Sequence, residues 1–143
     1  MSGTAMCRHL GHFFLPGVGA SVSVARRCTA AVLTAAKCRN IGDALLVTSE
    51  LVTNAIVHSR SGEGWVRIGV VDTGDGLIGI EVLDEGAATV PFPRIPGDGE
   101  LCGRGLWLVD ELSAKWGVRR TGNESSAVWA LVDTSEKQAT ADG

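Results

Sequence analysis

The feature that most constrains this chain is a change of hydrophobic period between His58 and Trp65. Before it, apolar residues recur at three- and four-residue steps, which predicts helices; after it, they alternate, which predicts strands. Two alternating runs, "WVRIGVV" (65–71) and "LIGIEVLD" (77–84), are separated by "DTGDG", a glycine-containing hairpin connection. Strands joined by so short a turn must pair antiparallel, so the sequence predicts a β-hairpin preceded by helices.

The segment before the hairpin predicts a short strand and two helices. "HFFL" (12–15) reads as a strand that ends at Pro16 and Gly17, and the helical period starts at Ser21. A second helix is predicted from Asp43 through "ALLVTSELVTNAIVH", ending at the turn cluster "SRSGEG". The positions that carry the first helical period are Val24, Cys28, Ala31, Val32 and Ala35.

The hairpin is followed by a long irregular stretch, "EGAATVPFPRIPGDGELCG", which holds three of the four prolines. Loops of this length in compact domains are commonly functional lids or else disordered. Next come a predicted helix, "LWLVDELSAK" (106–115), and two strands, "WGVRRT" (116–121) and "SAVWALVD" (126–133), joined by "GNES".

This order of elements predicts an α+β two-layer sandwich, with helices packed on one face of a mixed, mainly antiparallel sheet. Its expected boundaries are a flexible N-terminus at 1–11, a single domain at 12–133 and a flexible C-terminal tail at 134–143. The 143 residues fit one domain, and the 45% hydrophobic and 20% charged fractions are those of a globular protein.

Charge and hydropathy exclude some classes of function. The net charge is −3 and no basic block stands out, which argues against a nucleic-acid binder. No run approaches the ~18 apolar residues of a membrane span, and we expect a soluble, cytoplasmic protein without a membrane partner.

The cysteines indicate reduced thiols rather than a disulfide framework. Cys7, Cys28, Cys38 and Cys102 are spread widely and form no CxxC pair. Cys7, His9 and His12 lie close enough in sequence to raise the question of a metal site, but a fourth ligand and the usual finger spacings are missing.

One polar row in the second predicted helix is a candidate site. Glu50, Asn54 and His58 are four residues apart, so a helix stacks a carboxylate, an amide and an imidazole along one face. The row is either the solvated stripe of an amphipathic helix or the wall of a pocket. In a pocket, a carboxylate can serve as a general base and an amide oxygen can hold Mg²⁺.

A second candidate is Asp84, which ends the strand "LIGIEVLD". Alternation places it on the same face as Ile78, Ile80 and Val82. A carboxylate there can accept a hydrogen bond from an amino group on a bound ring, and Gly86 would let that ring approach the backbone. The alternative is a strand-end aspartate that turns the chain.

The third candidate is "GRGLWLV" (103–109), where two glycines are predicted to open a helix after the irregular stretch. A helix N-terminus offers free N–H groups and a positive dipole end, which suit phosphate, although a glycine-rich loop before a packing helix looks the same. The match of residues 74–79 to GxGxxG is better read as a hairpin turn, because strands are predicted on both sides of it.

These motifs occur in a fixed order: Glu…Asn on a helix, Asp-x-Gly at a strand end, a loop, then GxGL. Together they resemble the GHKL nucleotide-binding superfamily, from about Phe13 to Val132. Within it, "SELVTNA…H" and "GRGLWLVDELS" are most similar to the bacterial anti-sigma-factor serine/threonine kinases and their actinobacterial stand-alone relatives. The resemblance implies the GHKL ATPase/histidine-kinase-like fold and an ATP-binding domain at 12–133.

The resemblance also implies a role for each motif. Glu50 would polarise a serine or threonine hydroxyl on a partner, and Asn54 would coordinate Mg²⁺ at the ATP phosphates. Asp84, supported by Gly86, would recognise the adenine amino group. Residues 89–102 would form a lid, and His58 has no assigned role. The residues expected to wrap the phosphates are Gly103, Arg104, Gly105 and Leu106.

Two departures from the family pattern concern the lid. The first glycine box reads "DEGAATVP" and lacks the second glycine of DxGxG. The lid contains no lysine, and its one arginine is Arg94. Both departures bear on how the lid closes over a nucleotide.

The function expected from the sequence is an ATP/Mg²⁺-binding regulator that phosphorylates an anti-anti-sigma-type protein and sequesters a sigma factor. The alternative is a non-catalytic, nucleotide-gated module that binds a signalling partner, and a third reading is a scaffold that has lost ATP. The kinases that the chain resembles are commonly dimers, so a homodimer is among the expected assemblies.

Overall fold

The computed structural model describes residues 7–58, 64–85, 100–120 and 126–135, except for the side chains of His58, Glu85 and residues 100–105. Within these ranges lie five strands and three helices. None of the three described helices is long and apolar enough to cross a membrane. The elements are β1 (Arg8–Pro16), α1 (Ser21–Ala35), α2 (Gly42–His58), β2 (Trp65–Asp72), β3 (Leu77–Glu85), α3 (Glu100–Leu112), β4 (Lys115–Arg120) and β5 (Ser126–Asp133).

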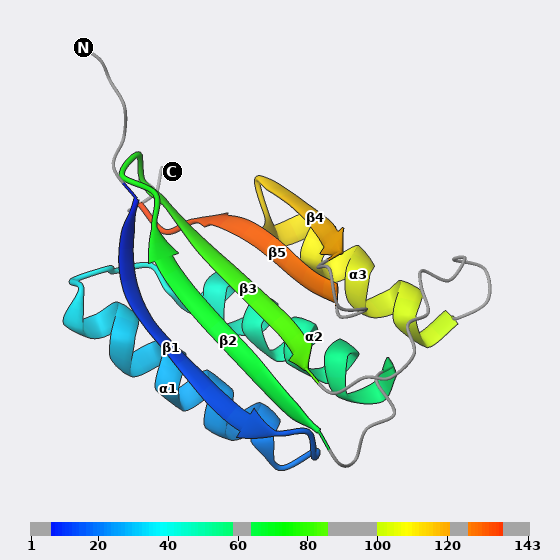
Figure 1. The fold of residues 1–143 in the computed structure, drawn as a ribbon. Helices are drawn as coiled ribbons and strands as arrows, with labels where there is room; N and C mark the ends of the chain where they lie inside the picture. The colour runs from blue at the N-terminus through cyan, green and yellow to red at the C-terminus, as the bar shows by residue number, and fades with distance from the viewer. Residues whose placement is uncertain (1–6, 59–63, 86–99, 121–125, 136–143) are drawn as a thin grey trace.

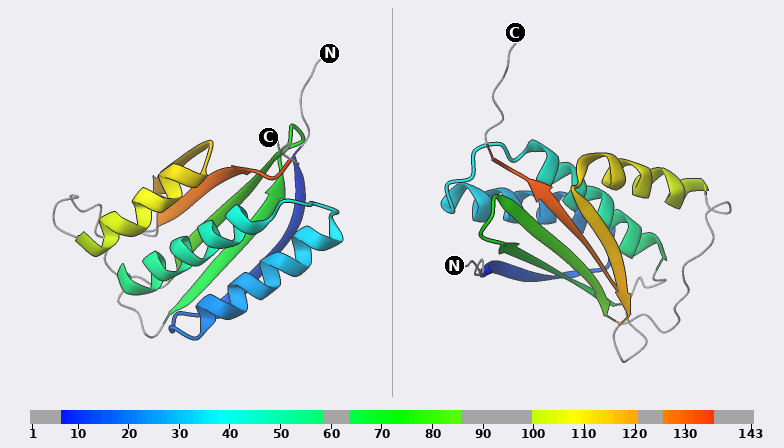
Figure 2. Two further views of the ribbon diagram at one scale, coloured as in Figure 1. Left: turned by 180° about the vertical axis from the view of Figure 1, so that it is seen from behind. Right: turned by 90° about the horizontal axis from the view of Figure 1, so that it is seen from above.

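The five strands form one sheet in the order β1-β2-β3-β5-β4, and the three helices cover one of its faces (Figures 1 and 2). This arrangement confirms the predicted α+β two-layer sandwich. The sheet was predicted to be mixed and mainly antiparallel. All four pairings between the described strands are antiparallel, so the described sheet is not mixed.

The predicted hairpin is the β2–β3 connection. Gly74 and Gly76 adopt φ values of 93° and 92°, a region that residues with a Cβ seldom occupy. The turn is closed by side chains: the Asp72 carboxylate accepts the Gly74 N–H at 2.9 Å, and the Thr73 hydroxyl donates to Asp75 at 2.6 Å. The GxGxxG match begins in the turn after β2 and ends inside β3, so the hairpin interpretation is confirmed.

The core lies between the helices and one face of the sheet. That face carries the alternating apolar residues of β2 and β3, as the sequence predicted. Ile78, Ile80 and Val82 of β3 are all at most 2% exposed, as are Val66, Ile68 and Val70 of β2 on the same face. The β2–β3 register places Val66 opposite Asp84. Asp84 therefore continues the core face at the end of β3.

Helix α1 is confirmed, but its buried side differs from the predicted one. The fully or nearly buried positions are Ser21, Ala25, Thr29 and Leu33, whereas Val24 is 36% exposed. Small residues predominate on the buried side, which lets the helix lie close to its neighbours. Ser21 also ties the start of the helix to β1, because its hydroxyl donates to the Pro16 carbonyl at 2.7 Å.

Several element boundaries differ from the sequence-based expectation. Strand β1 begins at Arg8 rather than at residue 12, so part of the segment predicted as a flexible N-terminus belongs to the sheet. Helix α3 ends at Leu112, because the chain then joins the sheet: the Ala114 N–H donates to the Leu131 carbonyl at 2.7 Å. Lys115, predicted as helical, is the first residue of β4.

The face of the sheet away from the helices carries several glycines. A Cβ built on Gly117 would lie 2.7 Å from the indole of Trp129, whereas a Cβ on Gly69 would meet nothing within 4 Å. Beside Trp129 on this face, Glu81 and Arg119 form an ion pair between β3 and β4. The indole therefore packs over the backbone of Gly117.

This contrast gives a matched pair of substitutions. We expect Gly117→Ala to lower the free energy of unfolding by about 1–3 kcal/mol, because the methyl group displaces the indole. Gly69→Ala should leave it unchanged or raise it by up to about 1 kcal/mol, because alanine restricts the unfolded chain. Urea denaturation measures both, and equal effects would contradict the packing of Trp129 on Gly117.

Two fully buried threonines give a second pair. The Thr48 hydroxyl donates to the Ala44 carbonyl at 2.8 Å, whereas the Thr29 hydroxyl has no hydrogen-bond partner among the described residues. A buried group left unpaired costs about 1–3 kcal/mol. We therefore expect Thr29→Val to raise the midpoint of thermal unfolding and Thr48→Val to leave it unchanged or lower it. A larger gain in Thr48→Val than in Thr29→Val would contradict this assignment.

Candidate functional site

The direction of α2 brings two of the predicted site motifs to one end of the molecule. Lys37 to Arg39, just before α2, line a hollow together with Leu77 and Ile78 at the start of β3. Because α2 packs on β3 and both start at this end, they run in the same direction. The C-terminal end of α2 therefore lies toward the C-terminal end of β3, as Figures 1 and 2 show.

Glu50 and Asn54 are both half-buried on α2, one turn apart. They lie beside the core positions Val47 and Leu51, which are fully buried. Val57, seven residues after Glu50 and therefore on the same side of the helix, is 60% exposed. Glu50 and Asn54 thus lie at the border between the buried and exposed sides of α2, and the choice between a pocket wall and a solvated stripe stays a prediction.

Asp84 is half-buried near the end of β3, on the helix-covered face of the sheet. The positions before it on that face, Ile80 and Val82, are buried. A half-buried carboxylate at the edge of the core can accept a hydrogen bond from an amino group on a bound heteroaromatic ring. Gly86, predicted to support such a ring, lies outside the described residues.

The start of α3 differs from the prediction for the second glycine box. The helix begins at Glu100, so Gly103 and Gly105 fall inside its first turns instead of opening it. Glycine costs roughly 0.5–1 kcal/mol in a helix interior but does not prevent the helix. The first four N–H groups of a helix lack a partner within it, and these now belong to Glu100–Gly103.

The structure describes Leu106 of the second glycine box in full, but only the backbone of the three residues before it. The backbones of Gly103, Arg104 and Gly105 lie in α3, but their side-chain surroundings fall outside the description. Leu106 is half-buried and packs against the core. The N-terminal end of α3 lies on the same side of the molecule as the C-terminal end of α2 (Figures 1 and 2), and the two helices pack together.

Two further predictions fall mainly or wholly beyond the described ranges. Of the predicted lid, 89–102, only 100–102 are described, as part of α3. His58 is the last residue of α2, and its side chain is outside the description. The roles assigned to both stay predictions.

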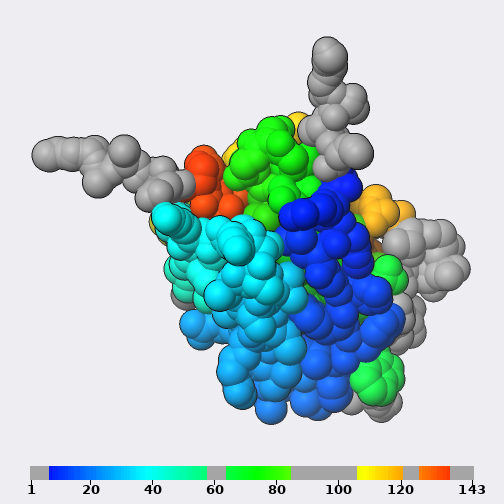
Figure 3. All heavy atoms as spheres, turned by 90° about the vertical axis from the view of Figure 1, so that its left-hand side faces the viewer, coloured from blue at the N-terminus to red at the C-terminus, as the bar shows by residue number. Residues whose placement is uncertain are grey.

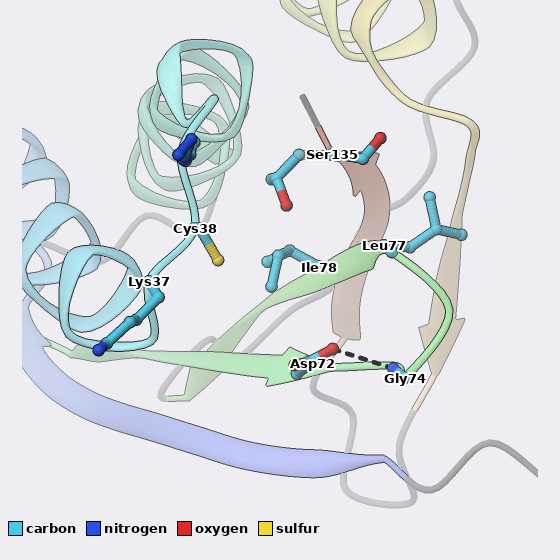
Figure 4. Close-up of a pocket in the computed structure, with 10 residues that line it drawn as sticks. Lys37, Cys38, Asp72, Gly74, Leu77, Ile78 and Ser135 are labelled. Atoms are coloured by element: carbon cyan, nitrogen blue, oxygen red, sulfur yellow. Dashed lines mark hydrogen bonds between the residues drawn. The ribbon is translucent and has the colours of Figure 1, made fainter. Parts of the chain in front are cut away.

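A separate hollow of about 400 Å³ lies at the opposite end of α2 and β3 (Figure 4). The Cys38 thiol points into it toward Ile78, and Asp72 lies at its edge, whereas the Lys37 side chain turns away. Its lining comes from three segments that share no motif, so no sequence pattern singled it out. The hollow lies apart from Glu50, Asn54 and Asp84.

The three-ligand metal site considered for Cys7, His9 and His12 is not formed. Within the described part of the chain, no group of three histidine, cysteine, aspartate or glutamate side chains is placed to hold a metal ion. His9 and His12 are nevertheless neighbours, with ring centroids 5.2 Å apart.

Three helices packed on one face of an antiparallel sheet are consistent with the fold of the GHKL-type ATP-binding domains. The family model described as the histidine kinase-like ATPase domain matches residues 16–131, from the end of β1 to β5. A comparison with curated proteins gave no match. The chain belongs to the histidine kinase-like ATPase domain family, and with it to the ATP-binding proteins that this family comprises.

The position of Asp84 leads to a prediction about ATP binding. We expect Asp84→Asn to weaken ATP binding at least about tenfold, because an amide can turn a donor toward the adenine amino group and loses the charge-assisted hydrogen bond. Calorimetric titration with ATP measures the dissociation constant.

The matched control is Asp72→Asn. Asp72 is an aspartate on the same face of the sheet, but at the opposite end, where it accepts the Gly74 N–H and lies 3.8 Å from Arg8. Its substitution should leave the ATP affinity unchanged. Equal losses in the two variants would remove Asp84 from the nucleotide site.

Proposed function

We propose that this protein is an ATP- and Mg²⁺-dependent serine/threonine protein kinase of the anti-sigma-factor type, acting on an anti-anti-sigma-type partner. The observation that supports it best is the position of Glu50 and Asn54, half-buried on the helix that runs toward the Asp84 end of β3. The proposal assigns the general base and the metal ligand to the C-terminal half of α2, and the acceptor for the nucleotide base to the end of β3 toward which that helix runs.

The residues present fit the ions and groups that such a kinase requires. Mg²⁺ prefers oxygen ligands and keeps several waters, so one half-buried amide oxygen, that of Asn54, is a sufficient protein ligand when the phosphates supply the others. The chemistry that Mg²⁺ would supply there is positive charge against the phosphates. Asn54 would hold the ion, and Glu50, one turn earlier, would face the acceptor.

The proposed reaction transfers the γ-phosphoryl group of ATP to a hydroxyl of the partner. The serine or threonine oxygen forms a bond to the γ-phosphorus, and the bond from that phosphorus to the oxygen bridging to ADP breaks. The hydroxyl proton passes to the Glu50 carboxylate, which acts as the general base. Partial burial holds the carboxylate in position on the rigid helix, and this limits the freedom lost on reaching the transition state.

Base selectivity would come from Asp84. An ionised carboxylate only accepts hydrogen bonds, so it pairs with the amino group at the adenine edge. Guanine presents a carbonyl oxygen at that position, which a carboxylate repels. The adjacent buried residues Val66 and Val82 supply the apolar end of the sheet toward which the ring would lie.

The sigma factor and the homodimer belong to the same proposal. Binding to an anti-anti-sigma-type partner would compete with binding to a sigma factor, and phosphorylation of the partner would shift that competition. A homodimer is the assembly expected from the kinases that the sequence resembles. The alternative, a nucleotide-gated module without catalysis, uses Asp84 but not Glu50.

The test is transfer of radiolabel from ATP to a candidate anti-anti-sigma protein. We expect Glu50→Gln to reduce the rate at least about 100-fold, since general-base catalysis contributes roughly 10²–10⁴-fold. ATP affinity should stay within about threefold of the wild type, because the amide keeps the shape of the side chain. Calorimetry on the same preparations measures this affinity.

The matched control is Asp43→Asn, which removes another carboxylate from the same helix, in its first turn. It should leave the transfer rate unchanged. Equal transfer by Glu50→Gln and the wild type would remove Glu50 from the mechanism. Partner binding that survives Glu50→Gln but not Asp84→Asn, without transfer in the wild type, would support the non-catalytic module, and absence of ATP binding would indicate a degenerate scaffold.

A further inference from the structure

Strand β1 carries two exposed histidines whose rings lie side by side. The ring centroids of His9 and His12 are 5.2 Å apart, with 52° between the ring planes. Three residues apart on a regular strand, two side chains point to opposite faces of the sheet. The proximity of these imidazoles therefore needs a local cause.

The cause is a β-bulge. His9 pairs with Val71 and His12 with Gly69, while the register shifts between His9 and Gly11. The bulge adds one residue to β1, so the two histidines face partner residues only two positions apart. Val71 and Gly69 lie on the face of β2 opposite to the core residues, so both imidazoles belong to the face away from the helices.

The surroundings leave these imidazoles accessible and oriented. β1 is an edge strand, and Figure 3 shows it uncovered beside α1. Gly69 puts no side chain opposite His12, and a Cβ there would meet no atom of the described residues within 4 Å. Phe14 packs edge-on against His12, with centroids 5.9 Å apart, and limits the rotation of that ring.

The spacing fits a shared metal ion. When two imidazole nitrogens bind one ion at about 2.0–2.1 Å in a tetrahedral arrangement, the ring centroids are about 5 Å apart. The charges nearby are separated from the pair: Arg67 lies over Phe14, and Arg8 is 3.8 Å from Asp72. Imidazole favours borderline ions such as Ni²⁺, Cu²⁺ and Zn²⁺ over Mg²⁺.

We propose that His9 and His12 form a two-histidine chelate for a divalent transition-metal ion, with water completing the coordination. The β-bulge in β1 places the two side chains on the same face of the sheet. His9 and His12 are distant in sequence from Glu50, Asn54 and Asp84, and β2 lies between their strand and β3. The proposed metal site therefore does not depend on the proposed kinase activity.

The test uses Ni²⁺, which binds imidazole and does not oxidise thiols, and protein without a histidine tag. Isothermal titration calorimetry of the wild type should give one Ni²⁺ per chain. His9→Ala and His12→Ala should each weaken binding at least about tenfold, because the second ligand of a chelate binds at high effective concentration. Paramagnetic broadening by Ni²⁺ should affect the imidazole signals of both residues.

Two controls separate the chelate from other causes of binding. Cys7→Ser removes the thiol nearest in sequence and should leave the Ni²⁺ affinity unchanged. All variants should keep the melting temperature and the ATP affinity of the wild type, because the substituted side chains are exposed.

Three results would overturn the proposal. One is Ni²⁺ affinity that is equal in the wild type and both histidine variants. Another is loss of binding in Cys7→Ser while both histidine variants still bind. The third is one Ni²⁺ per two chains with a doubled mass in solution, which would place the ion between copies instead of within one strand.

Discussion

The arrangement of core and site depends on the register of the β2–β3 hairpin. The turn, with Gly74 and Gly76 at positive φ, fixes that register, and the register assigns every second residue of β3 to the helix-covered face. Ile78, Ile80 and Val82 complete the core, and Asp84 follows on the same face. A slip of one residue would move Asp84 to the opposite face while exposing the core residues. The same pairing thus positions the proposed nucleotide contact and stabilises the fold.

Local patterns predicted the elements that have a strong period of their own. The alternation of β3 and the turn "DTGDG" identified the hairpin and the side of Asp84, and the length of the apolar pattern identified α2. The two-layer architecture followed, because short turns require antiparallel pairing and the helices must cover a face. For Glu50 and Asn54, the four-residue spacing predicted a shared helix face, and the structure added their partial burial.

Three features could not be predicted from local sequence patterns, because they depend on tertiary contacts: the buried side of α1, the β-bulge in β1 and the start of α3. The buried side of α1 is lined by Ala25 and Thr29, which carry no strong apolar signal, so the larger Val24 was favoured wrongly. The bulge in β1 breaks the alternation that would have marked a strand before residue 12. Helix α3 starts at Glu100 although glycines usually mark a boundary, and no propensity argument predicted that.

The strand order has a consequence for how the molecule forms. β5 lies between β3 and β4, although it is the last described strand in the chain. During synthesis, β1 to β3 are complete long before their neighbour leaves the ribosome, and β3 keeps an open row of backbone donors and acceptors until then. Such an edge pairs readily with other chains. Until β5 pairs with β3, this edge is therefore open to pairing with other chains.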